Sequence, residues 1–154
     1  MELVFRSINE LDLSILRKWK NDNREAFFYK DEISEEDQDE WYRNWNKYPD
    51  DYMFIIENDS IPIGCVAVRF INKEWDIYNV ILGEKRFAKQ GVMSMGLKVI
   101  IGIALDKRIA PVRVRVLRGN PVVDWYKKNG FIVTLENFGF KSSNHYVMTY
   151  QGET

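Results

Sequence analysis

Apolar and polar residues follow two different periods along this chain, and these periods predict its secondary structure. Short segments of alternating or continuous apolar residues are typical of β-strands when turn-forming residues separate them. Asn58-Asp59-Ser60 and Asn72-Lys73 are turns of this kind, so the strands beside them are expected to form antiparallel hairpins. The predicted strands cover residues 3–8, 52–57, 61–71, 75–82, 112–116, 131–135 and 146–150.

Two helices are predicted before the first hairpin. Asn9 with Asp12, and Ser34 with Asp37, match a capping box, in which an N-cap residue and the third residue after it each accept a backbone N–H. The first of these helices is expected to bury a face formed by Leu11, Ile15 and Trp19.

Two further helices are predicted in the second half of the chain. Residues 91–105 are apolar almost all round, with Lys98 as their only charge, which indicates a helix buried against a sheet. Asn120 as N-cap, Pro121 in the first turn and Gly130 at the end mark the fourth helix. The resulting order, β-α-α-β-β-β-α-β-α-β-β, predicts an α/β (α+β) fold. Its sheet of about seven strands is mixed and mostly antiparallel, and four helices flank it.

Composition limits the class of protein. The 154 residues, 45% of them hydrophobic, are expected to form a single domain over 1–154. A single Cys and a single His exclude a disulfide framework or a Cys/His zinc site, so no metal is expected. No apolar run approaches the roughly 20 residues that cross a bilayer, and the N-terminus does not resemble a signal peptide. We therefore expect a cytoplasmic protein without a membrane partner.

The net charge of −1 conceals an asymmetry between two parts of the chain. Residues 85–128 contain 11 basic and 2 acidic residues, a net charge of +9, and the remainder carries −10. The near-neutral total indicates no nucleic-acid partner, whereas the basic part would attract a small anion. The alternative is that these charges are simply solvated on two helices and a strand. A monomer and a homodimer are both compatible with the sequence.

The junction between the strand ending at residue 82 and the next helix is the first candidate site. A helix N-terminus presents unpaired N–H groups and a partial positive charge, which suits phosphate. Lys85, Arg86 and Lys89 precede this helix, Gly91 would let a ligand approach the backbone, and Ser94 lies in the first turn. A plain turn is the alternative interpretation.

The order of residues around the fourth helix resembles a known family. Asn120, Tyr126 and Gly130-Phe131 stand at the spacing found in the GNAT family of N-acetyltransferases. A second motif of that family, Arg or Gln, two residues, Gly, one residue, then Gly or Ala, falls on residues 88–93, where only Gly91 matches. The element order also agrees, so the resemblance covers nearly the whole chain.

The resemblance implies an acyl-CoA N-acyltransferase-like fold and an acetyl transfer from acetyl-coenzyme A. The acceptor would be a primary amine of a small molecule, such as an amino sugar, or a protein N-terminus, attacking directly in a ternary complex. Through residues 16–21 and 33–41 the chain looks closest to the branch acting on ribosomal-protein N-termini and nucleotide-linked amino sugars. The alternative is a non-catalytic coenzyme A-binding sensor or adapter, because the second motif is incomplete.

The resemblance also implies where coenzyme A would bind. Its phosphates would lie at the helix that follows the basic loop, and its pantetheine amides would pair with the strand before that loop. A backbone N–H in this strand could polarise the thioester carbonyl. Asn120 is either a pantetheine ligand or only an N-cap. The residues predicted to bind coenzyme A are Val80, Ile81, Leu82, Lys85, Arg86, Lys89, Gln90, Gly91, Val92, Met93, Ser94 and Asn120.

Catalytic and acceptor-binding candidates follow from the same resemblance. Tyr126 could donate a proton to the departing thiolate, or it is only a core aromatic residue. Asp76 could take the proton of the amine, or it is a solvated carboxylate at a hairpin end, and Cys65 fits a core role better than a nucleophile. The acidic residues within 31–40 either attract a cationic amine or complement a helix dipole. The residues predicted to contact the acceptor are Arg24, Phe27, Phe28 and Tyr29.

Overall fold

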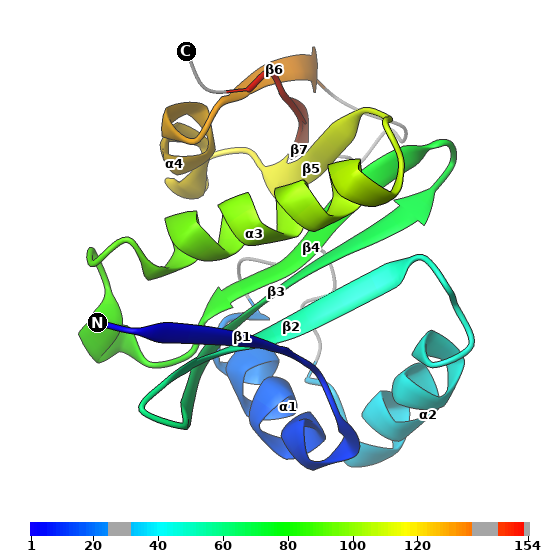
Figure 1. Cartoon of the computed structure of the whole chain (residues 1–154), viewed down its shortest axis with the longest axis vertical. Coiled ribbons are helices and arrows are strands. Elements are labelled where there is room, and N and C mark those ends of the chain that lie inside the picture. Colours follow the sequence, from blue (N-terminus) through cyan, green and yellow to red (C-terminus); the bar gives the residue numbers. More distant parts are fainter. Residues whose placement is uncertain (25–31, 137–144, 153–154) are drawn as a thin grey trace.

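A mixed seven-stranded sheet with four helices organises the chain, of which the computed structural model describes residues 1–24, 32–136 and 145–152 (Figure 1). The strand order is β1-β2-β3-β4-β5-β7-β6, and β4–β5 is the parallel pair. The strands are β1 (Leu3–Ser7), β2 (Asp51–Asn58), β3 (Ile61–Ile71), β4 (Glu74–Leu82), β5 (Val112–Leu117), β6 (Phe131–Glu136) and β7 (His145–Tyr150). The helices are α1 (Leu13–Asp22), α2 (Glu35–Trp45), α3 (Val92–Lys107) and α4 (Val122–Lys128), with 3-10 turns at Glu10–Asp12 and Lys85–Phe87. The predicted fold class and element order are confirmed.

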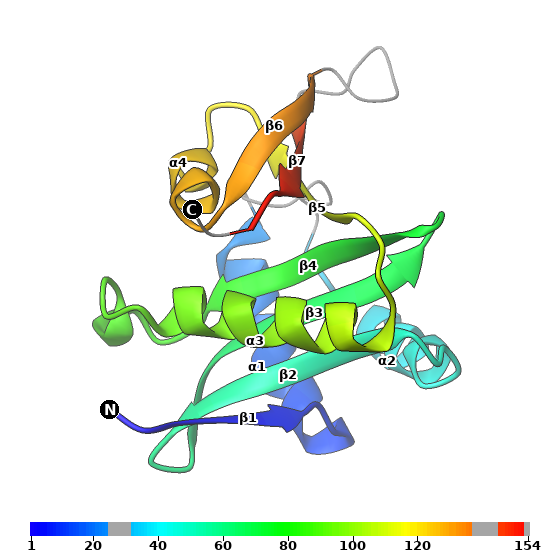
Figure 2. The same cartoon turned by 45° about the horizontal axis from the view of Figure 1, so that its top comes forward.

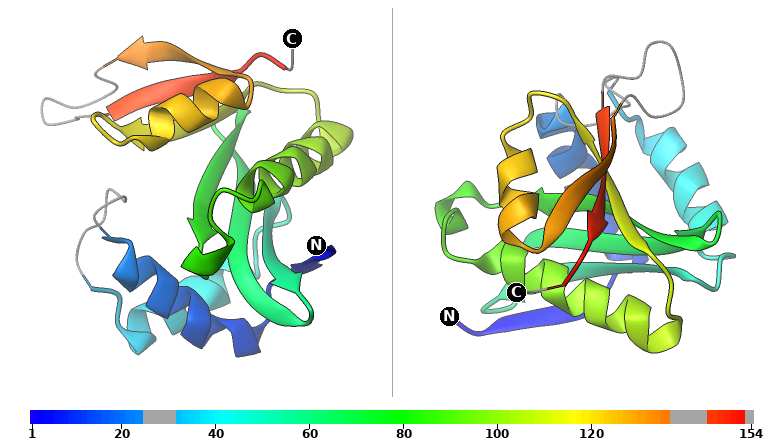
Figure 3. Two further views of the ribbon diagram at one scale, coloured as in Figure 1. Left: turned by 90° about the vertical axis from the view of Figure 1, so that its left-hand side faces the viewer. Right: turned by 90° about the horizontal axis from the view of Figure 1, so that it is seen from above.

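Helices cover both faces of the sheet and create two cores. α1 and α2 lie on one face and α3 on the other (Figure 3). α3 runs across β3, as Figure 2 shows, and buries residues such as Leu97 and Ile100 against that strand's Val66. On the opposite face, Leu16 and Trp19 of α1 pack among residues of β2 and β3. Burial of these apolar faces is the main force holding the layers together.

The two hairpins form as the sequence predicts. Asp59 and Ser60, and likewise Asn72 and Lys73, adopt positive φ angles between 52° and 65°. Two consecutive left-handed residues make the turn whose twist matches that of antiparallel strands. These turns fix the β2–β3 and β3–β4 registers.

The predicted capping residues at Asn9 and Ser34 are in place, but one predicted core position is wrong. Asn9 and Asp12 form the expected reciprocal capping box, although it opens a 3-10 turn and α1 begins later, at Leu13. Ser34 accepts the N–H of Asp37, which is half of the predicted box. Leu11, however, is 92% exposed. The reason is that residues 10–12 form a separate 3-10 turn, whose tighter winding shifts the phase of the side chains before α1 begins. The residues of α1 that are buried are Leu13, Leu16 and Trp19.

The parallel strands β4 and β5 separate partway along their length, and this positions the site. Their pairing runs only from Trp75 with Val112 to Ile77 with Val114. Beyond it, β4 continues to Leu82 while remaining paired with β3 on its other side. The edge of residues 78–82 that faces away from β3 therefore has backbone groups free of strand partners, a ready template for an added extended chain.

Candidate active site

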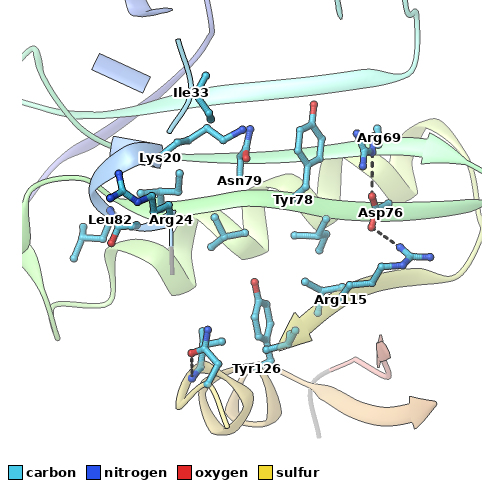
Figure 4. Close-up of a pocket in the computed structure, with 18 of the residues that line it drawn as sticks. Lys20, Arg24, Ile33, Arg69, Asp76, Tyr78, Asn79, Leu82, Arg115 and Tyr126 are labelled. Carbon is cyan, nitrogen blue, oxygen red and sulfur yellow. Dashed lines mark hydrogen bonds and ion pairs between the residues drawn. The ribbon is translucent and has the colours of Figure 1, made fainter. Parts of the chain in front are cut away.

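A cleft of about 670 Å³ opens where β4 and β5 separate. Side chains from the C-terminal end of α1, from β4 and β5, and from the start of α4 line it (Figure 4). Eight of the eighteen separately predicted site residues therefore meet around one space. Those that line the cleft are Arg24, Asp76, Val80, Ile81, Leu82, Lys85, Asn120 and Tyr126.

The remaining predicted residues fall into two groups. The first group occupies the loop and first turn of α3, beyond the Lys85 end of the cleft, and does not line it. The second group, Phe27, Phe28 and Tyr29, lies outside the described residues. The members of the first group are Arg86, Lys89, Gln90, Gly91, Val92, Met93 and Ser94.

A β-bulge shapes the wall of the cleft that β4 provides. Between Tyr78 and Ile81, β4 contains one residue more than the facing part of β3. Asn79 accommodates this extra residue with a left-handed φ of 49°, and a bulge of this kind bends the strand and redirects its groups. The thiol of Cys65 donates to the Asn79 carbonyl at 3.2 Å. Burial raises the pKa of Cys65 to about 12, so this side chain remains a thiol in the core.

The N-terminus of α3 lies next to the cleft and suits an anion. Met95 N–H donates to the Gly91 carbonyl as the first helical hydrogen bond, so the N–H groups of residues 92–94 have no acceptor within the helix. Gly91 has a φ of 77°, and a Cβ built there would meet nothing within 4 Å. Lys85 Nζ is held by the Leu82 carbonyl at 3.1 Å. Open backbone, helix dipole and a fixed cation together fit a phosphate group.

Tyr126 faces β4 from the other side of the cleft (Figure 4). Its side chain is buried, with only 4% of the residue exposed, and its ring packs edge-on against Trp125 and Phe131. Burial raises the pKa of Tyr126, so the phenol is protonated at neutral pH. Within the described part of the chain the hydroxyl has no hydrogen-bond partner, which leaves its proton for a ligand.

The Asn120 side chain lies both at the start of α4 and in the wall of the cleft. The N-cap position of α4 is Pro121 and not Asn120 as predicted, because α4 begins one residue later, at Val122. Asn120 Oδ1 still accepts the N–H of Val122 at 3.0 Å. The side chain also lines the cleft with its amide group. This hydrogen bond and a place in the cleft are therefore compatible.

Asp76 is the centre of an ion-pair network. Its carboxylate accepts from Arg69 Nε at 3.0 Å and from Arg115 Nη1 at 2.8 Å, and only 5% of the residue is exposed. The alternative of a solvated carboxylate is therefore wrong. Arg115 also contacts Glu74, which in turn pairs with Arg113.

Three basic side chains of the cleft were not predicted: Lys20, Arg69 and Arg115. Trp19 brings the end of α1 here, because its indole packs against Gly83, where any Cβ would come within 2.0 Å of the ring. Burial lowers the pKa of Lys20. A signal for Arg69 did exist in the sequence, since Arg69 and Asp76 are equally far from the Asn72-Lys73 turn and a two-residue hairpin sets them opposite each other.

The described residues contain no group of three His, Cys, Asp or Glu side chains placed to hold a metal ion. No helix among them is long and apolar enough to cross a membrane.

Solved structures share this fold over nearly their full length. A domain from Methanocaldococcus jannaschii DSM 2661 superposes with a TM-score of 0.81 at 19% identity, covering 96% of this chain and 97% of that one. A ribosomal-protein-alanine N-acetyltransferase from Brucella melitensis gives 0.76 at 17%, covering 95% and 96%. The PaiA N-acetyltransferase from Thermoplasma acidophilum, in complex with coenzyme A, gives 0.71 at 21%, covering 97% and 99%.

Sequence comparison identifies the family. No curated protein shows significant sequence similarity to the chain. Residues 2–132, which include all elements of the cleft, match the family described as "Acetyltransferase (GNAT) domain". The members of this family transfer an acetyl group from acetyl-coenzyme A, and the open β4 edge, the α3 N-terminus and the basic side chains beside them fit that substrate. The chain therefore belongs to the GNAT family and is an acetyl-coenzyme A-dependent acyltransferase.

Proposed function

We propose that this protein transfers the acetyl group of acetyl-coenzyme A directly to a primary amine within a ternary complex. The amine belongs to a small molecule or to a peptide N-terminus. The observation that carries the proposal is the position of Tyr126, whose unpartnered, protonated hydroxyl faces the bulged edge of β4 across the cleft. The chain acts as a single domain over residues 1–154, in the cytoplasm and without a metal.

Backbone and basic groups hold coenzyme A in this proposal. The unpaired edge of β4, at Val80, Ile81 and Leu82, pairs with the amides of the pantetheine arm. Asn120 adds its side-chain Nδ2, because only its Oδ1 is engaged, by the N–H of Val122. The residues that would hold the phosphates are Lys85, Arg86, Lys89, Gln90, Gly91, Val92, Met93 and Ser94.

Acetyl-coenzyme A supplies a thioester, whose carbonyl carbon is the electrophile. A backbone N–H of β4 near the bulge stabilises the negative charge that develops on the carbonyl oxygen. The Tyr126 hydroxyl gives its proton to the sulfur as the carbon–sulfur bond breaks, so the thiol leaves in neutral form. Because the phenol has few polar neighbours, it does not lose this proton to the protein beforehand.

The charge of the cleft favours a neutral amine over an ammonium ion. Lys20, Arg69 and Arg115 line it, and nearby positive charge lowers the pKa of a bound ammonium group. Asp76 was predicted to be the general base, but its carboxylate oxygens accept from two arginines. We propose that Asp76 positions these arginines and that the amine loses its proton to water.

Release of the coenzyme A thiol tests the proposal against its alternative. Acetyl-coenzyme A is incubated with the protein and a panel of amines, and the free thiol is measured over time. Amine-dependent release, with a matching acetylated amine identified by mass spectrometry, supports the transferase. Tight binding of coenzyme A without release for any amine would instead favour a sensor or adapter, the function that the incomplete motif at residues 88–93 leaves open.

A further inference from the structure

We infer that the acceptor carries an anionic group, a carboxylate or a phosphate, in addition to its amine, and that Arg69 binds this group. The inference rests on the proposed function, because it names the class of amine that the cleft selects.

Among the described residues that line the cleft, basic side chains outnumber acidic ones. Five of these residues are basic, and one, Asp76, carries a carboxylate. The charged groups just behind the wall, namely Glu74, Arg113 and Asp51, do not remove this excess. A cleft of this kind attracts a negatively charged ligand and repels an ammonium ion. The five basic residues are Lys20, Arg24, Arg69, Lys85 and Arg115.

Arg69 and Arg115 lie away from the place where the phosphates of coenzyme A would bind. Lys85 lies at the end of β4 that leads to the N-terminus of α3, where a phosphate fits. Arg69 and Arg115 lie at the other end, where Asp76 joins them near the point at which β4 and β5 still pair (Figure 4). At this end three arginines, with Arg113 included, face three carboxylates, those of Asp76, Glu74 and Asp51. Arg69 nevertheless lies apart from the predicted phosphate site, so an anion bound by its guanidinium would be a second one.

Arg69 is built to receive a ligand. Its Nε is fixed by Asp76 at 3.0 Å, and its guanidinium carbon lies 4.5 Å from the centre of the Tyr78 ring. Tyr78 is in turn held by a hydrogen bond from its hydroxyl to Asp51. Within the described part of the chain no acceptor contacts the two terminal nitrogens of Arg69, and 42% of its side chain is exposed. A planar guanidinium fixed in this way presents a fork that matches a carboxylate or a phosphate.

The described acidic residues of the segment 32–40 do not provide an opposing site for a cation. Of the described residues 32–40, only Ile33 lines the cleft. Glu35 and Asp37 are exposed in the first turn of α2, where they complement the helix dipole. The described wall of the cleft therefore selects by positive charge.

Matched pairs of amines test the inference. We would compare glucosamine with glucosamine 6-phosphate, and phenylalaninamide with phenylalanine, by kcat/KM for thiol release and by calorimetric binding to the protein–coenzyme A complex. The member with the anion is expected to be favoured roughly 10- to 100-fold, as for a charged hydrogen bond. A preference within the first pair alone identifies phosphate, and within the second alone identifies carboxylate.

Replacing Arg69 tests whether this residue causes the preference for anionic amines. Arg69→Gln should abolish the preference without affecting the affinity for coenzyme A. Arg43→Gln removes the same charge from an exposed position on α2 outside the cleft and should leave the preference intact. Equal turnover of neutral and anionic amines by the unmodified protein would overturn the inference while leaving the transferase function in place. If no amine turns over, the proposed function fails, and binding of the neutral members as tightly as the anionic ones overturns the inference as well.

Discussion

Replacing Tyr126 by Phe removes a single oxygen atom and should separate catalysis from stability. The ring keeps its contacts with Trp125 and Phe131, whose ring centres lie 4.9 and 5.4 Å away. Because the hydroxyl has no hydrogen-bond partner among the described residues, the free energy of unfolding should change by less than about 1 kcal/mol. Loss of a general acid should lower kcat roughly 10²–10⁴-fold, which corresponds to about 3–5 kcal/mol of activation free energy.

The assay measures thiol release at saturating acetyl-coenzyme A and amine, with the melting temperature and the affinity for coenzyme A determined in parallel. Tyr52→Phe is the control, because Tyr52 packs against Trp75 and does not line the cleft. Burial raises the pKa of Tyr126, so the activity that depends on its proton should persist to a higher pH than for an ordinary phenol. A Tyr126→Phe protein with at least half of the original turnover would refute the general-acid role.

Three further results are expected. Gly91→Val should weaken coenzyme A binding by roughly tenfold or more in calorimetry, since Val is strained at a φ of 77° and its side chain covers the backbone N–H groups, while the fold is retained; unchanged affinity in a folded variant would exclude this phosphate site. Asp76→Asn should lower the free energy of unfolding by about 1–3 kcal/mol, because it weakens two ion pairs. The fall in rate at acidic pH should remain in this variant. If that fall disappears, Asp76 is the general base. Cys65 should not react with a thiol reagent at pH 8 until the protein is unfolded, because burial raises its pKa to about 12. Because the pKa of Cys65 is higher in the folded than in the unfolded protein, the free energy of unfolding should fall as the pH rises from about 9 towards 12. Reaction of Cys65 in the folded protein would contradict its core position.

Local signals predicted the elements because each depends on a few neighbouring residues. Turn residues such as Asn72-Lys73 fix both the position and the register of a hairpin, and capping residues such as Asn9 fix where a helix begins. Leu11 is the exception. It lies at α-helical spacing from Ile15, which predicts burial, but residues 10–12 form a 3-10 turn and Leu11 is exposed.

Local motifs in the sequence predicted some of the residues that line the cleft and missed others. Lys85 and Tyr126 belong to local motifs, whereas Lys20 and Arg115 reach the cleft only through the packing of α1 and the partial pairing of β5. The bulge at Asn79 was also missed. The bulge arises because β4 has one residue more than the facing part of β3. The only sequence signal for it is Asn79 itself, since Asn tolerates a left-handed φ better than most residues.

Initial rates of thiol release, measured while acetyl-coenzyme A and an accepted amine are varied together, test direct transfer in the cleft most directly. Direct attack requires both substrates to be bound at once, so the double-reciprocal lines should intersect and no thiol should be released without amine. Parallel lines, with a burst of thiol and an acetylated protein formed in the absence of amine, would show that the acetyl group passes through the enzyme and would contradict the account.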